Sequence, residues 1–326
     1  MSLFHPRLTE KLVGHEAAWD FLYRLYEQGK VSPCWILNGP RGIGKATFAY
    51  QFARRILVQN TQNPLGLQDP LVARQIKANS YPNLWVLEKP IEEGEEAQEI
   101  PLSQAKKILD FLGQTPRIPG WRVVIIDAAD ELNRSAGNCL LKILEEPPAQ
   151  TLIFLISHAW GQVLATLRSR CQRYDLYPLE KQDLVSFYHN QEEIKDPLFQ
   201  ISQGSIGRYQ QLLQAGGEEF LNSLKSMITL ARRGQWVHLQ KFCQDIAKIP
   251  EKFETLLWVL PFLVYRYTLS CSLDVQEEWL LIWQKLTHFL VAAKDRHLDK
   301  NQLLLGCFLV IENPYDHVGS LSELKI

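Results

Sequence analysis

The residues most able to do chemistry form one glycine-rich segment, residues 39–47, which reads GPRGIGKAT. A phosphate-binding loop has the spacing GxxxxGK followed by Ser or Thr, so that backbone N–H groups cradle phosphate and the lysine reaches its outer oxygens. The N-terminus of the following helix adds a partial positive charge. Ala46 stands where the magnesium-binding hydroxyl is needed, and Thr47 comes one position late, turned by about 100° along a helix. The pattern predicts a descendant of a phosphate-binding loop. A plain glycine turn is the alternative, and nucleotide binding stays open.

A second candidate is Asp127, which ends the apolar run VVIID. P-loop ATPases hold magnesium with an aspartate at the end of such a strand, and active ones usually place glutamate next. Here Ala128 follows, while Asp130 and Glu131 stand at the wrong spacing. An ordinary buried strand with an acidic end is the alternative. Because Ala46 and Ala128 fall on the two positions that hydrolysis most needs, we predict a module that kept the fold and lost turnover.

The third candidate is Arg170, in the segment TLRSRC at residues 166–171. Arginine is permanently charged, and its fork of N–H groups matches phosphate oxygens. An arginine donated in trans to a neighbour's nucleotide raises kcat by about 10³–10⁵, which is about 4–7 kcal/mol of barrier. A surface arginine paired with a local acid is the alternative. The preceding segment LLKILEEPP, residues 140–148, predicts only an amphipathic helix with a proline stop.

Alternating strands and helices must position these residues. Apolar runs predict strands at residues 34–39, 84–87, 121–127 and 151–157, and helical periodicity predicts helices at 15–28, 46–58, 103–113 and 133–144. Residues 59–83 are expected to form a loop with one short helix, and the acidic residues 88–99 a solvated loop. This alternation is typical of an α/β domain with a parallel sheet.

The pattern changes after Tyr177-Pro178, and no further strong strand is expected. Helical spacing recurs at 183–190, 206–215 and 220–231, and long amphipathic stretches follow from residue 238. We therefore predict three domains, at residues 1–178, 179–235 and 236–326. A length of 326 residues is in keeping with two or three domains.

Composition narrows the class of protein. The net charge is -1 and the pI about 6.7, so the basic character of a protein that grips nucleic acid alone is missing. We expect any DNA contact to be shared with partner chains.

The apolar stretch at 256–265 is too short for a membrane span of about 20 residues. The six cysteines form no CxxC pair, which favours a reduced cytoplasmic protein without zinc.

Together these residues resemble the clamp-loader branch of the AAA+ proteins. The resemblance rests on LVGHE, NGPRGIGKAT, IIDAAD, NCLLKILEEPP and LRSRC, of which LLKxLEEPP and the SRC triplet are specific to that branch. Asp-Ala-Ala at 127–129 is similar to the delta-prime type and differs from the gamma/tau motors. The resemblance is strong over residues 5–180 and weak at 204–208 and 297–300. It implies an α/β AAA+ domain (a P-loop NTPase-like parallel sheet with flanking helices), then a small helical lid domain and an all-α C-terminal collar.

The resemblance also implies partners. Delta-prime proteins stand in a ring with delta and gamma/tau subunits, which opens the beta sliding clamp and places it on primed DNA during replication. Arg170 would reach the ATP site of the adjacent gamma/tau subunit as an arginine finger, and the rest of the chain would serve as a stator. The chain would belong to the DNA polymerase III holoenzyme, a nucleotidyltransferase, while being neither the polymerase nor an active ATPase. DNA contacts would be to the phosphate backbone, without sequence preference.

By the same resemblance, certain positions would line any nucleotide site: Val13, Gly14, Gly39, Gly42, Gly44, Lys45, Thr47, Asp127 and Ser157. Val13 and Gly14 match the region that contacts adenine, and Ser157 matches the first sensor position, where threonine or asparagine is more usual. Many relatives bind zinc through four cysteines after the phosphate-loop helix. Residues 59–83 contain none, so we predict no metal. Arg208 lies one residue out of step with the second sensor arginine.

The expected cofactor follows from these departures: ATP or ADP binds weakly or not at all, and Ala46 argues against magnesium. Two other functions are considered. An active AAA+ ATPase, such as the gamma/tau motor, would need Thr47 and Asp130 to compensate for the two alanines. A small-molecule P-loop kinase is a further alternative, but the long helical second half and the SRC triplet argue against it.

Overall fold

The computed structural model describes residues 5–9, 11–59, 70–92, 95–97, 99–188, 194–294 and 299–312. Two compact units make up the chain, the first comprising Met1–Ile194 with Gly204–Gly207 and the second Lys195–Gln203 with Arg208–Ile326. The domain boundaries expected at residues 178 and 235 stay predictions. Among the described residues, no helix combines the length and the apolar character that crossing a membrane requires.

A five-stranded parallel sheet forms the centre of the first unit, in the order β2-β5-β6-β1-β7. Its strands are β1 (Cys34–Asn38), β2 (Leu84–Glu88), β5 (Arg122–Asp127), β6 (Thr151–Ser157) and β7 (Gln172–Asp175). The predicted fold class and the first four strands are confirmed. The edge strand β7 was not predicted, because its residues QRYD are polar and half or fully exposed and so lack an apolar run.

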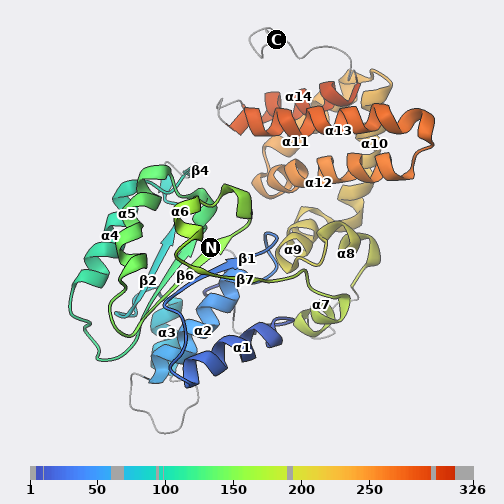
Figure 1. Ribbon diagram of the computed structural model, residues 1–326. Coiled ribbons are helices and arrows are strands. Elements are labelled where there is room, and N and C mark those ends of the chain that lie inside the picture. The colour runs from blue at the N-terminus through green and yellow to red at the C-terminus, as the bar shows by residue number, and fades with distance from the viewer. Residues whose placement is uncertain are drawn as a thin grey trace. The chain divides into compact units, whose positions relative to one another are not determined.

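Helices cover both faces of this sheet (Figure 1). On one face, α1 (Glu16–Glu27), α2 (Lys45–Gln59) and α3 (Pro70–Lys77) surround an aromatic core that includes Phe48, Phe52 and Phe154. On the other face, α4 (Leu102–Gly113), α5 (Arg134–Glu145) and α6 (Ala165–Arg168) bury Ile108, Leu140 and Leu167. The near-continuous apolar strands are therefore explained by burial from both sides.

Short elements connect these layers. The 3-10 turns η1 (Ala129–Glu131) and η2 (Trp160–Gln162) follow β5 and β6, and α7 (Lys181–Tyr188) follows β7. The acidic segment expected as a loop contains a small antiparallel hairpin, β3 (Ile91–Glu92) with β4 (Glu95–Glu96). A two-residue ladder is held by backbone bonds, so the side-chain pattern gave no sign of it. Residues 60–69, within the predicted loop at 59–83, lie outside the described residues.

The described part of the second unit is helical. Its elements are α8 (Asp196–Ser202), α9 (Ile206–Ala215, in this unit from Arg208), α10 (Gly217–Arg232), α11 (Trp236–Ala247), α12 (Pro250–Ser270), α13 (Leu273–Lys294) and α14 (Lys300–Glu312). Only α8 was not predicted. Leu256, Leu260, Leu286 and Phe308 are fully buried, which explains the long amphipathic pattern. An ion pair of 2.5 Å between Arg232 Nη2 and Glu278 Oε1 joins α10 to α13.

Candidate nucleotide site and Arg170

The phosphate-binding loop connects β1 to α2, as the strand–loop–helix pattern predicted. Gly39, Gly42 and Gly44 have φ angles of 152°, 79° and 104°, which are backbone conformations that residues other than glycine rarely adopt. A Cβ on Gly39 would lie 2.3 Å from the carbonyl oxygen of Leu176, which leaves no room for one. This loop conformation therefore requires glycine at all three positions. An ordinary turn that tolerates other residues would not.

Lys45 lies within this loop and is only 2% exposed. Its Nζ donates hydrogen bonds to the carbonyl oxygens of Gly39, at 2.6 Å, and of Pro40, at 2.5 Å. The ammonium group thus lies where a phosphate-binding lysine is needed, at the first helical residue of α2. Ala46 and Thr47 follow it half-buried, and Ala46 packs against the aromatic core.

Three residues outside the loop hold its backbone. His15 Nε2 bonds the carbonyl oxygen of Ile43 at 2.8 Å, and burial lowers the pKa of His15. The other two lie in Gly204–Gly207, the short segment that belongs to the first unit. Ser205 Oγ donates to the Arg41 carbonyl at 3.0 Å, and the Gly207 amide donates to the Gly42 carbonyl at 3.0 Å. The resemblance included the segment LVGHE and, weakly, residues 204–208, but it implied no role for His15, Ser205 or Gly207. Only the folded chain shows that both segments support the same loop.

Asp127 ends β5 beside β6, in register with Ile156. Burial, together with the charges of Glu88 and Glu131, raises the pKa of Asp127 to about 6 against the opposing charges of Lys45 and Arg41. Asp127 thus lies close enough to Lys45 for their charges to interact, and their role in a nucleotide site stays a prediction. Asp130, the acid that could have compensated for Ala128, accepts the His158 amide at 2.9 Å through Oδ1. This oxygen of Asp130 is therefore engaged by the backbone amide that follows β6.

Two buried polar atoms near this charge cluster lack hydrogen-bond partners among the described residues, namely Ser157 Oγ and His158 Nδ1. Ser157 ends β6, in register with Asn38 of β1, so it stands at the strand end that precedes the phosphate-binding loop. Burial, together with the positive charges of Lys45, Arg41 and Lys89, lowers the pKa of His158 to about 3. The positive charges of Lys45, Arg41 and Lys89 thus gather at this strand end, and such a field favours negative charge nearby.

The remaining predicted positions lie at different places. Val13 is buried, and Gly14 has a φ of 71° and packs so tightly that a Cβ would lie 2.3 Å from Leu179 Cδ2.

Arg208 belongs to the second unit, where its guanidinium lies 5.1 Å from the Trp258 ring centre and donates to Gln203 Oε1. Over the described ranges, no group of three or more His, Cys, Asp or Glu side chains is placed to hold a metal ion.

Arg170 lies in the turn between α6 and β7, with its side chain 32% exposed. Its Nε donates to Glu145 Oε1 at 2.6 Å, and its Nη2 forms an ion pair with the same oxygen. Its Nη1 donates to the Thr166 carbonyl at 3.0 Å and to Ser169 Oγ at 3.1 Å. Glu145 belongs to LLKILEEPP, the segment to which physical reasoning alone gave no function. The structure therefore joins the two most specific motifs of the sequence in one contact.

A family model described as DNA polymerase III, delta subunit, matches residues 14–180. The chain belongs to this family. It is 35% identical over 157 residues to the DNA polymerase III subunit delta' of Pseudomonas aeruginosa, covering 48% of this chain and 45% of that relative. It is 27% identical over 226 residues to the delta' subunit of Escherichia coli, covering 68% and 66%.

Gamma and tau subunits are also similar to this chain. The tau subunit of Bacillus subtilis is 25% identical to it, over 70% of this chain and 39% of that relative. Among solved structures, a gamma subunit-related protein of Thermotoga maritima aligns with 89% of this chain and 98% of its own, at a TM-score of 0.43 and 17% identity. The chain thus spans about two fifths to two thirds of the length of these sequence relatives.

Proposed function

We propose that this chain is the delta-prime subunit of a bacterial clamp loader, in which it helps load the beta sliding clamp onto primed DNA. In this proposal it supplies Arg170 to the ATP site of an adjacent gamma/tau subunit and serves as a stator. Family membership and the similarity to delta' subunits support the assignment. The observation that carries it is the family match over residues 14–180, because the exposed Arg170 is ion-paired with Glu145, a contact that the alternative of a surface arginine beside a local acid also expects.

The contacts of Arg170 suit a group that acts on another subunit's nucleotide. Glu145, Thr166 and Ser169 engage all three guanidinium nitrogens, so the side chain is ordered before a partner arrives. An arginine held in place in advance loses less conformational freedom when it meets phosphate, which strengthens its effect on a transition state. Four contacts leave one N–H, on Nη2, for a phosphate oxygen.

The chain's own nucleotide centre is proposed to lack turnover. Ala46 offers no hydroxyl for magnesium, and the buried Ala128 offers no carboxylate for the attacking water. Asp130 is engaged by the His158 amide. We propose that ATP or ADP binds weakly or not at all, with Lys45 and the loop amides holding any phosphate, and that neither magnesium nor zinc is bound.

The proposed assembly contains gamma/tau and delta as direct neighbours. The beta clamp is contacted indirectly, and primer-template DNA is contacted through the assembled complex without sequence preference, in keeping with the net charge of -1. The described helices of the second unit would supply the lid and the collar that holds the subunits together. A cytoplasmic location follows from this role in replication.

The decisive experiment is reconstitution with gamma/tau and delta, followed by measurement of DNA-stimulated ATPase. Arg170→Ala should lower kcat by about 10³-fold at the one site that it serves, while the complex still assembles. Arg134→Ala, an exposed arginine at the start of α5, is the matched control and should leave the ATPase unchanged. An unchanged ATPase in the Arg170 variant removes the finger assignment, and failure to assemble with gamma/tau removes the whole proposal.

One observation favours a second candidate, an active motor ATPase. The loop keeps its three left-handed glycines and a buried Lys45, the geometry that phosphate binding needs. If this candidate is right, the purified chain should hydrolyse ATP in the presence of magnesium, and Lys45→Ala should abolish that turnover. The delta-prime proposal expects no turnover in either protein.

A further inference from the structure

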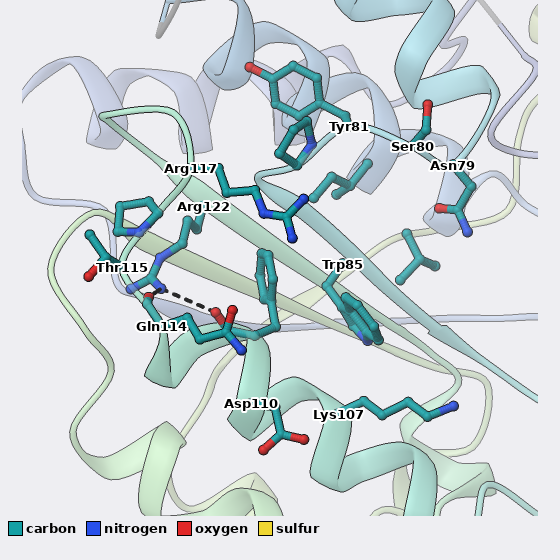
Figure 2. A pocket seen from close by; sticks show the side chains of 15 residues that line it. Asn79, Ser80, Tyr81, Trp85, Lys107, Asp110, Gln114, Thr115, Arg117 and Arg122 are labelled. Atoms are coloured by element: carbon teal, nitrogen blue, oxygen red, sulfur yellow. Dashed lines mark hydrogen bonds between the residues drawn. The ribbon is translucent and has the colours of Figure 1, made fainter.

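A pocket of about 530 Å³ lies at the edge of the sheet in the first unit (Figure 2). It is lined by residues 79–82, the start of β2, α4 and residues 114–117. These segments precede β2 and β5, whereas the phosphate-binding loop follows the carboxyl end of β1. In a parallel sheet the pocket therefore lies at the end opposite the nucleotide site. Nothing in the proposed function uses it.

The strand beside this pocket is an edge strand. Within the described part of the chain, β2 pairs with β5 alone, so its other side carries backbone N–H and C=O groups without a strand partner. Unpaired sheet edges are templates for an additional strand, and several protein families bind extended peptides in this way. The backbone at this pocket can thus recognise another backbone.

An aromatic pair forms the wall between β2 and α4. The rings of Trp85 and Phe111 lie 5.7 Å apart between centres and are tilted by 32°. Trp85 Nε1 is buried and has no hydrogen-bond acceptor among the described residues. A buried donor without an acceptor is destabilising, and native proteins rarely leave one. Figure 2 shows the Trp85 indole in the pocket wall beside Lys107, so an acceptor oxygen on a ligand could reach the enclosed Nε1 if the exposed Lys107 side chain moved aside.

The charged side chains of the pocket are mostly cationic. Its lining contains Lys107, Arg117 and Arg122 but a single acid, Asp110. Arg122 is only 5% exposed, and its Nη1 donates to the carbonyl oxygens of Leu112, at 3.0 Å, and Gln114, at 2.8 Å. These hydrogen bonds are all to carbonyl oxygens, and among the described residues no carboxylate forms an ion pair with this buried charge. Lys107 and Arg117 are exposed and form no ion pair with a described residue.

We propose that this pocket binds an extended acidic segment of a partner protein, which adds as a strand to the free edge of β2. The segment's backbone would pair with β2, a carbonyl oxygen would accept the Trp85 indole N–H, and its acidic side chains would face Lys107 and Arg117. A nucleic-acid strand fits less well, because it offers no backbone N–H groups to a sheet edge and its phosphates would approach Asp110.

The test uses the full chain and a fluorescein-labelled hexapeptide of alternating glutamate and valine, with fluorescence anisotropy as the readout. Binding should protect the amides of residues 84–88 from hydrogen exchange. Trp85→Phe keeps an aromatic ring against Phe111 but removes the donor, and it should weaken binding about fivefold. Replacing both Lys107 and Arg117 with alanine should weaken binding about threefold to tenfold, and Asp110→Asn should strengthen it.

Controls separate the possible ligands. Lys30→Ala removes an exposed cation that follows α1 and does not line the pocket, so it should not change binding. A peptide with proline in place of valine lacks half of the backbone donors and should not bind. The proposal is overturned if the glutamate–valine peptide does not bind at millimolar concentration, or if Trp85→Phe has no effect while the fold is intact by circular dichroism. It is also overturned if oligo(dT) binds at this pocket in preference to the peptide.

Discussion

Glu145 and Arg170, 25 residues apart in sequence, share a hydrogen bond of 2.6 Å between Oε1 and Nε. The bond connects the last residue of α5 to the turn after α6. Glu145 is half-exposed, at 49% of its side chain, so solvent weakens the attraction and the pair contributes little to stability. Its effect is on geometry, because the carboxylate contacts two of the three guanidinium nitrogens and restricts the direction of the side chain.

The first prediction concerns this positioning contact. In the reconstituted loader, Glu145→Gln should lower the kcat of DNA-stimulated ATPase by about tenfold, because Arg170 is then less well placed for the neighbour's phosphate. KM for ATP should change little. Glu146→Gln alters the next glutamate, which is exposed, and is the matched control. In a double mutant with Arg170→Ala the Glu145 change should have no further effect, and additive losses would argue against coupling.

The second prediction concerns the missing magnesium ligand. Ala46→Thr returns a hydroxyl to the position after Lys45, and Ala46→Val has the same shape without the hydroxyl. Binding of a fluorescent ATP analogue should tighten about tenfold with magnesium for the threonine variant, a change of about 1.4 kcal/mol. The valine variant should show no magnesium dependence. Neither should hydrolyse ATP, since Ala128 still supplies no carboxylate. Turnover by the threonine variant would show that another acid serves the water.

The third prediction is a pair of opposed pH dependences. Asp127 has a pKa of about 6 in the fold against an ordinary 3.8, so between these values only the folded chain holds the proton and stability falls as pH rises. His158 has a pKa of about 3 against an ordinary 6.5, so only the unfolded chain holds the proton and stability rises with pH. Each slope is about 1.4 kcal/mol per pH unit, and the two oppose each other between pH 4 and 6.

Single substitutions should therefore reveal each slope in urea unfolding of the nucleotide-free chain. Asp127→Asn should leave stability rising with pH between 4 and 6, because His158 and His15, whose pKa values burial lowers, are then not opposed by Asp127. His158→Gln should make the slope of stability against pH more negative than in the original chain over the same interval, because His15, whose pKa burial also lowers, then opposes Asp127 without His158. If both variants keep the pH profile of the original chain, the two pKa values are not shifted as described.

The fourth prediction concerns the buried guanidinium of Arg122. It donates to carbonyl oxygens at the end of α4, including those of Leu112 and Gln114. Arg122→Met keeps a long side chain but leaves these carbonyls without a donor, and it should lower the free energy of unfolding by about 2–4 kcal/mol. Arg117→Met, at an exposed position nearby, should change it by less than about 0.5 kcal/mol. Equal effects would show that burial of Arg122 has no special role.

The elements that the sequence located best are those with the longest apolar runs. The strand ending in Asp127 and the strand TLIFLIS are buried from both faces, so their side chains gave an unmistakable signal. The edge strand β7 and the two-residue hairpin of β3 and β4 depend on backbone pairing and carry polar side chains. Side-chain patterns therefore could not reveal them.

The sequence by itself determined the phosphate-binding loop, the two alanines that replace its catalytic groups, and the arginine of the SRC triplet, because each is a matter of residue type at fixed local spacing. The tertiary structure decided which distant residues act on them. It placed Glu145 against Arg170, His15 and Ser205 against the loop, and Trp85 with an unsatisfied donor at a free sheet edge. These contacts join segments far apart along the chain, and only packing fixes which of the many polar side chains meet.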